Sequence, residues 1–169
     1  GHELAAFAWS GHLDPESGLW FDFDLESAYK AAAPASDEAQ DAADDQSDWE
    51  ASIVWGNYHK CTLTSEKGFL VGTPERPLSF DELAGRAFHV DPLPLHPENA
   101  PAFATYLLGH DSVADHSIRF VERAGLFDFS VAWSGKIALT YAGDDVFRHS
   151  FEAHLMPSRF LGFRLPVSA

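Results

Sequence analysis

The feature that most constrains this sequence is a run of alternating side chains from Leu126 to Leu165. Over residues 127–133, large apolar residues occupy every second position, with small or polar residues between them. Because successive side chains of a strand point to opposite faces of a sheet, this period indicates strands with one buried face. Turn-forming residues interrupt the run at Ser134–Gly135, Gly143–Asp145 and Met156–Ser158. We therefore expect four strands in an antiparallel meander, since turns this short cannot hold a crossover helix.

The N-terminal half carries the same signal. Leu19–Leu25 alternates cleanly and, with Leu4–Trp9, predicts a hairpin, and a second hairpin is predicted from Ala51–Thr64 and Phe69–Val71. Helix-forming residues predict short helices at Glu26–Ala33, after Ser79, and at Pro97–Leu108. The expected fold class is α+β, predominantly antiparallel β. We expect a curved sheet or a partly open barrel of about 8–9 strands with two or three short helices.

The length of 169 residues and a hydrophobic content of 46% predict a single domain, 1–169, with one core. An acidic insert interrupts it at about 34–50. Seven carboxylates and no basic residue occur between Ser36 and Glu50. Charge repulsion disfavours an isolated helix there, so a solvated loop or a docking arm for a basic partner is expected.

The formal net charge of −15, from 26 acidic and 11 basic residues, restricts the partners. Nucleic acid and anionic membrane surfaces are not expected, because both require a basic footprint. The charge predicts a basic protein partner and a non-enzymatic interaction protein, with an immunity or inhibitor protein for a basic toxin as the leading case. The acidic residues assigned to the partner-binding surface are Asp22, Asp24, Asp37, Glu38, Asp41, Asp44, Asp45, Asp48 and Glu50.

The alternative is a small-ligand-binding or catalytic barrel, because curved sheets can enclose cavities with a few polar groups. Its aromatic and histidine lining would come from Trp55, His59, Trp133, Tyr141 and His149. No G-x-S-x-G, G-x-G-x-x-G or P-loop motif occurs, so we assign no catalytic residue and no cofactor, and a non-enzymatic protein is favoured.

One palindromic segment, His110-Asp111 with Asp115-His116, contains residue types that ligate metals. In a helix, two histidines six residues apart do not share a face, so each would need ligands from elsewhere. An exposed polar linker is the favoured explanation of the segment, and no metal is expected. A tetrapeptide, AWSG, occurs twice, at Ala8–Gly11 and Ala132–Gly135. Similar turn chemistry or an internal duplication would each account for the repeat.

The single cysteine, Cys61, excludes an internal disulfide. This favours a reducing compartment, and a cytoplasmic location is expected. The first residue is Gly1 rather than methionine, so a signal peptide removed earlier would leave no trace.

Overall fold

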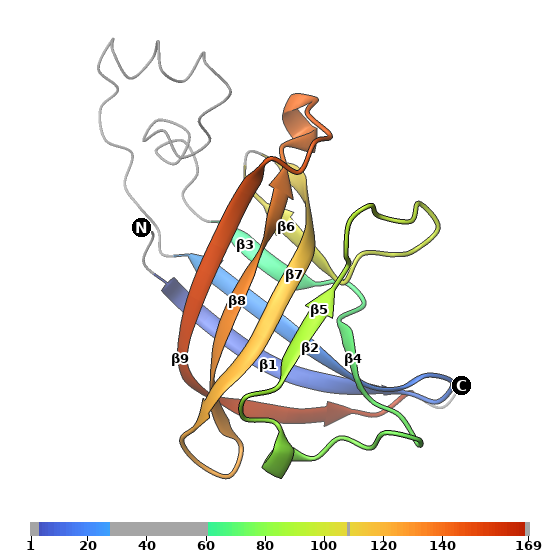
Figure 1. Ribbon diagram of the computed structural model, residues 1–169, viewed down its shortest axis with the longest axis vertical. Helices are drawn as coiled ribbons and strands as arrows, with labels where there is room; N and C mark the ends of the chain where they lie inside the picture. The colour runs from blue at the N-terminus through green and yellow to red at the C-terminus, as the bar shows by residue number, and fades with distance from the viewer. Residues whose placement is uncertain (1–3, 28–60, 108, 168–169) are drawn as a thin grey trace.

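The computed structural model describes residues 4–27, 61–107 and 109–167, and it is 60% β-strand. Seven strands form a closed barrel in the order β1-β9-β8-β7-β6-β3-β2, with β2 pairing back to β1 (Figure 1). The barrel strands are β1 (Leu4–Asp14), β2 (Gly18–Ser27), β3 (Thr62–Ser65), β6 (Phe103–Tyr106), β7 (His110–Arg123), β8 (Asp128–Ala138) and β9 (His149–Arg164). Two further strands add to its sides, β4 (Phe69–Gly72) on β2 and β5 (Ala87–Val90) on β7.

Pairing between the first and last strands closes the barrel. Trp9 and His12 of β1 lie opposite Phe160 and Arg164 of β9, and these strands run parallel. The other strand pairs of the described chain are antiparallel. The expected antiparallel β-structure is therefore confirmed, whereas the expectations of an α+β fold and a partly open barrel were wrong. The helices of the described residues are two 3₁₀ turns, η1 (Phe80–Glu82) and η2 (Thr140–Ala142).

The C-terminal meander exists, but with fewer and longer strands than its turn residues suggested. β8 passes through Ser134–Gly135 without a turn, and β9 passes through Met156–Ser158. β9 pairs with β8 as far as Arg159 and with β1 from Phe160, and Figure 1 shows the strand bending sharply at this change of partner. Pro157 lies beside that bend, a position where a missing backbone donor is tolerated. The chain turns at Gly143 as predicted, and this glycine has a φ of 87°.

Two other sequence predictions were wrong. β3 and β4 do not form a hairpin with each other, because both pair with β2, at Asp24–Glu26 and at Leu19–Phe21. The expected helix over Pro97–Leu108 is replaced by the strand β6, which lies between β3 and β7. Strand pairing on both sides of Phe103–Tyr106 overrides the local helix preference of this segment.

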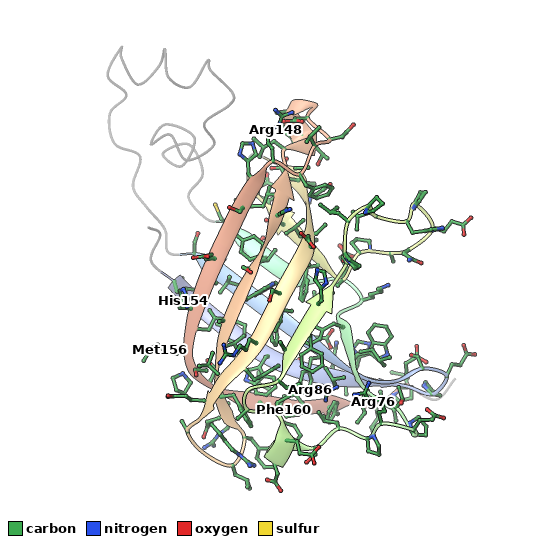
Figure 2. All side chains as sticks on the ribbon, in the orientation of Figure 1. Arg76, Arg86, Arg148, His154, Met156 and Phe160 are labelled. Atoms are coloured by element: carbon green, nitrogen blue, oxygen red, sulfur yellow. The ribbon has the colours of Figure 1, made fainter. Side chains whose placement is uncertain are left out.

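Aromatic rings fill the barrel interior. Trp9, Phe21 and Phe23 are completely buried, and Trp9 meets Phe21 edge to face with ring centroids 5.1 Å apart. Trp133 packs against Phe103 at 4.6 Å. Along β9, alternate side chains enter this core, whereas His154 and Met156 point away from the barrel (Figure 2). Burying rings of this size is the largest apolar contribution to the stability of the fold.

The repeated AWSG tetrapeptide has a packing explanation. Trp9 and Trp133 are both core residues, and the glycine two positions later faces the same interior. A Cβ atom on Gly11 would lie 2.5 Å from the ring of Phe163, and one on Gly135 would lie 2.6 Å from the ring of Phe151. Each glycine thus leaves room for a phenylalanine of β9.

Candidate functional site

Two aspartates at the β5–β7 strand pair have an unusual backbone conformation. Asp91, directly after β5, and Asp115, within β7, have φ angles of 50° and 52°, a region that side-chain-bearing residues rarely adopt. The backbone N–H of Asp115 donates a hydrogen bond to the carbonyl of Asp91 at 2.7 Å. Such strained positions persist only where surrounding contacts impose them. Asp91 lines one surface hollow and Asp115 lines another, so this hydrogen bond joins the two.

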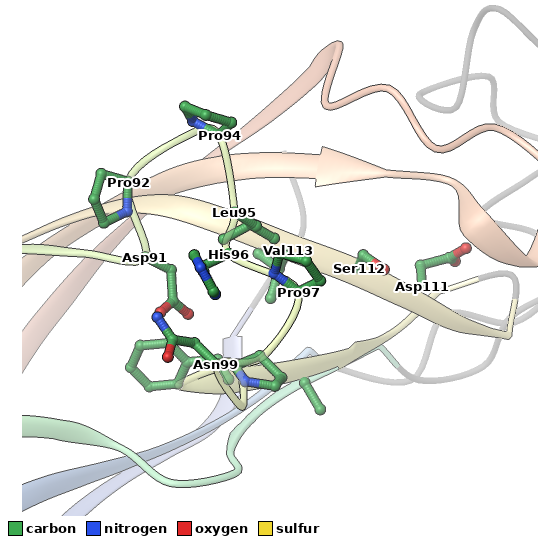
Figure 3. Close-up of a pocket in the computed structure, with 13 residues that line it drawn as sticks. Asp91, Pro92, Pro94, Leu95, His96, Pro97, Asn99, Asp111, Ser112 and Val113 are labelled. Carbon is green, nitrogen blue, oxygen red and sulfur yellow. The ribbon is translucent and has the colours of Figure 1, made fainter.

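The first hollow, of about 540 Å³, lies between the 91–101 loop and strands β6 and β7 (Figure 3). Its apolar lining includes Phe103, Val113 and several prolines of the loop. Asp91, Asn99, His96, Ser112 and Asp111 provide its polar groups. A volume of this size, apolar walls and a few polar side chains are typical of binding sites.

Hydrogen bonds fix both acidic walls of the first hollow. The Asp91 carboxylate accepts a hydrogen bond from the backbone N–H of Ala102 through Oδ2 at 2.8 Å, which ties the two ends of the loop together. Asp111 is buried, and its Oδ1 accepts a hydrogen bond from the backbone N–H of Tyr141 at 3.0 Å. The hollow is therefore held by β5, β6, β7 and η2 rather than by the loop alone.

The second hollow, of about 600 Å³, lies on the outer face of β7, β8 and β9. There Asp115 Oδ1 is 2.8 Å from His89 Nε2, and its Oδ2 is 3.3 Å from Lys136 Nζ. The hydrogen bond with His89, and to a lesser degree Lys136, lowers the pKa of Asp115. Its carboxylate is thus matched by basic groups of the same chain.

The four metal-ligand candidates, His110, Asp111, Asp115 and His116, are kept apart because they lie along one β-strand, β7. The segment is a strand rather than a helix or linker; His110 is exposed, whereas His116 is completely buried. Trp133 donates its indole N–H to His116 Nδ1 at 3.1 Å, so the neutral imidazole carries its proton on Nε2. Burial lowers the pKa of His116 to about 4. Within the described residues, no group of three or more His, Cys, Asp or Glu side chains could hold a metal ion.

The described members of the predicted aromatic and histidine pocket lie apart. Trp133 and His149 are buried in the barrel, whereas Tyr141 of η2 is 70% exposed. The two hollows are lined by other residues. Trp55 and His59 lie outside the described residues, as do the seven carboxylates of the acidic segment and most of the predicted helix at Glu26–Ala33.

Asp22 differs from the expected exposed carboxylate. It is buried on the outer side of β2, 2.6 Å from His12 Nδ1 and 3.3 Å from Arg164 Nη2. Asp24 is exposed as expected, and partial desolvation followed by the charge of Asp22 raises its pKa. Only Asp24 of this pair therefore belongs to an open acidic surface.

The barrel joins the two ends of the segment that contains most of the assigned acidic residues. Ser27, the last residue of β2, donates its backbone N–H to the carbonyl of Cys61 at 2.9 Å. The backbone N–H of Cys61 in turn donates to Ser27 Oγ at 2.9 Å. Burial raises the pKa of the Cys61 thiol to about 11, opposite to the change that a reactive thiolate requires.

The 91–101 loop was not identified as a site from the sequence, where its prolines suggested only a connector. A signal was present, because the connection is longer than the typical length of about four to six residues, and long connections within compact domains are often functional. A scan of protein-family models and searches of curated proteins and of solved structures found no match to this chain. Among the described residues, no helix has both the length and the apolar character needed to cross a membrane.

Proposed function

We propose that this protein is a non-enzymatic binding protein that captures a basic protein partner through its acidic surface. The observation that carries the proposal is the net charge of −15 on a chain with an aromatic core. Such a charge accelerates association with a cationic partner and disfavours anionic ones. An immunity or inhibitor protein that neutralises a basic, toxin-like protein is the leading case.

Ion pairing within the barrel supports this proposal. Several of its basic side chains are already paired with carboxylates of the described chain, namely Arg123, Lys136, Arg148, Arg159 and Arg164. These cations are therefore partly neutralised locally and do little to offset the acidic segment at 36–50. The hydrogen bonds between Ser27 and Cys61 anchor both ends of the longer 28–60 segment to one edge of the barrel.

Titration with a decalysine peptide at increasing salt tests the proposal. We expect saturable binding that weakens at least tenfold between 50 mM and 200 mM salt, because exposed charges are screened over about 10 Å at 0.1 M. Binding that is unchanged by salt, or no binding at 50 mM, would refute the electrostatic proposal.

Two multiple-substitution variants test whether the acidic segment is the binding surface. The first replaces the seven carboxylates between Asp37 and Glu50 with amides. Its charge-matched control neutralises seven exposed carboxylates of the barrel, namely Glu16, Glu66, Glu75, Glu82, Glu98, Glu122 and Asp145. We expect the first variant to lose more affinity than the control. Equal losses would show that net charge, and not the acidic segment, attracts the peptide.

A further inference from the structure

We propose that the hollow beneath the 91–101 loop receives an arginine side chain of the basic partner. This inference rests on the proposed function and adds a specific receptor site to it. The 13 described residues that line the hollow include two aspartates and one histidine but no lysine or arginine. An arginine combines an apolar stem with a planar, weakly hydrated cation, so it can contact both apolar walls and carboxylates.

The two hollows differ in the groups that lie beside their carboxylates. In the second, the carboxylate of Asp115 already lies beside Lys136 Nζ and His89 Nε2. In the first, the carboxylate of Asp91 accepts a hydrogen bond from the backbone N–H of Ala102. A cation from another molecule would therefore supply a type of group that the described lining of the first hollow does not contain.

Asp91 is the residue best placed to meet the guanidinium. Its bond to Ala102 uses Oδ2, which leaves Oδ1 as the acceptor for a guest among the described contacts. Figure 3 shows Asp91, His96 and Asn99 around one end of the hollow, with Ser112 and Asp111 along β7. The apolar stem would lie against the exposed prolines of the loop, Pro92, Pro94 and Pro97, because Phe103 is only 1% exposed.

The position of the hollow is compatible with the acidic segment acting on the same partner. β6 contributes Phe103 and Ala104 to the hollow, and Tyr106 at its other end pairs with Thr62 of β3. Thr62 follows Cys61, where the 28–60 segment rejoins the barrel. At about 3.3 Å per strand residue, the hollow and this junction are roughly 10 Å apart along β6.

The test uses the full chain labelled with ¹⁵N and the capped tripeptide acetyl-Gly-Arg-Gly-amide. Its neutral counterpart contains citrulline, which keeps the shape of arginine and removes the charge. We expect saturable amide shifts at residues 91–104 and 111–113, with a dissociation constant on the order of 1 mM. The citrulline peptide should bind at least fivefold more weakly.

Two single substitutions complete the test. Asp91→Asn removes the charge, and asparagine tolerates the positive φ of this position and can still accept the Ala102 hydrogen bond. Glu98→Gln removes one charge from the same loop at a residue that does not line the hollow. We expect at least a fivefold loss of affinity for Asp91→Asn and less than a twofold loss for Glu98→Gln.

Three results would overturn the inference: no saturable shifts at the lining residues, equal binding of the citrulline peptide, or equal losses for the two variants. If decalysine still binds in a salt-dependent manner in that case, the proposed function stands and only the arginine site is rejected. If decalysine does not bind either, both proposals are rejected.

Discussion

Acidification should destabilise this barrel through His116. The imidazole is completely buried and accepts the indole N–H of Trp133, so it must be neutral in the folded protein. Its pKa falls from the ordinary value of 6.5 to about 4 because burial disfavours the charged form, although neighbouring Asp115 opposes this change. A pKa that is lower in the folded than in the unfolded state means that the unfolded chain binds the proton first.

The sign and size of the effect follow from this difference in pKa. The contribution of neutral His116 is fully present above pH 6.5 and is lost as the pH falls toward 4. A difference of about 2.5 pKa units corresponds to about 3 kcal/mol of unfolding free energy, of which about 2 kcal/mol should be lost between pH 7.5 and pH 5. The lowered pKa values of Asp14 and Asp144 act below this window, because their ordinary value is 3.8.

Urea unfolding followed by tryptophan fluorescence at several pH values measures this loss. The matched variant is His116→Asn, because the amide oxygen can still accept the Trp133 N–H but the side chain does not titrate. We expect the stability difference between wild type and variant to shrink by about 2 kcal/mol from pH 7.5 to pH 5. Parallel stability curves for the two proteins would refute a depressed His116 pKa.

Three further predictions concern stability and reactivity. Replacing Trp133 with Ala should cost about 3–5 kcal/mol of unfolding free energy, and a loss below about 1 kcal/mol would contradict its burial. Gly135→Ala should cost about 1–3 kcal/mol, since the new methyl group would meet Phe151, and a Phe151→Leu replacement should recover part of this loss in a double-mutant cycle. The Cys61 thiol should react with iodoacetamide at pH 8 about 100-fold more slowly in the folded protein than in urea, because its pKa is about 11; equal rates would be inconsistent with that value.

Several strands of the barrel could be predicted because their signal is local. The alternation at Leu19–Leu25 places Phe21 and Phe23 in the core, where the structure has them. The same reasoning was wrong at Ser134–Gly135, whose sequence is typical of a turn. Gly135 is required there by the ring of Phe151 from the neighbouring strand, and no local pattern contains that contact.

The candidate site depended on tertiary structure even more strongly. Asp91 and Asp111 are twenty residues apart, and they line one hollow because β5 and β6 both pair with β7. The prolines of the loop indicated an irregular connection, but not that it covers Phe103 and Val113. The ion pair of Asp22 likewise involves Arg164 from the other end of the chain, 3.3 Å away.

The sequence by itself determined the charge, the predominance of β-strands and most of the aromatic core, since composition and period-two alternation are properties of short segments. Only the tertiary structure decided that the sheet closes, because closure requires β1 to pair with β9 across nearly the whole chain. It also decided which carboxylates, such as Asp115 and Asp22, lie beside basic side chains of the same chain. Those distinctions depend on distances between residues that are remote in the sequence.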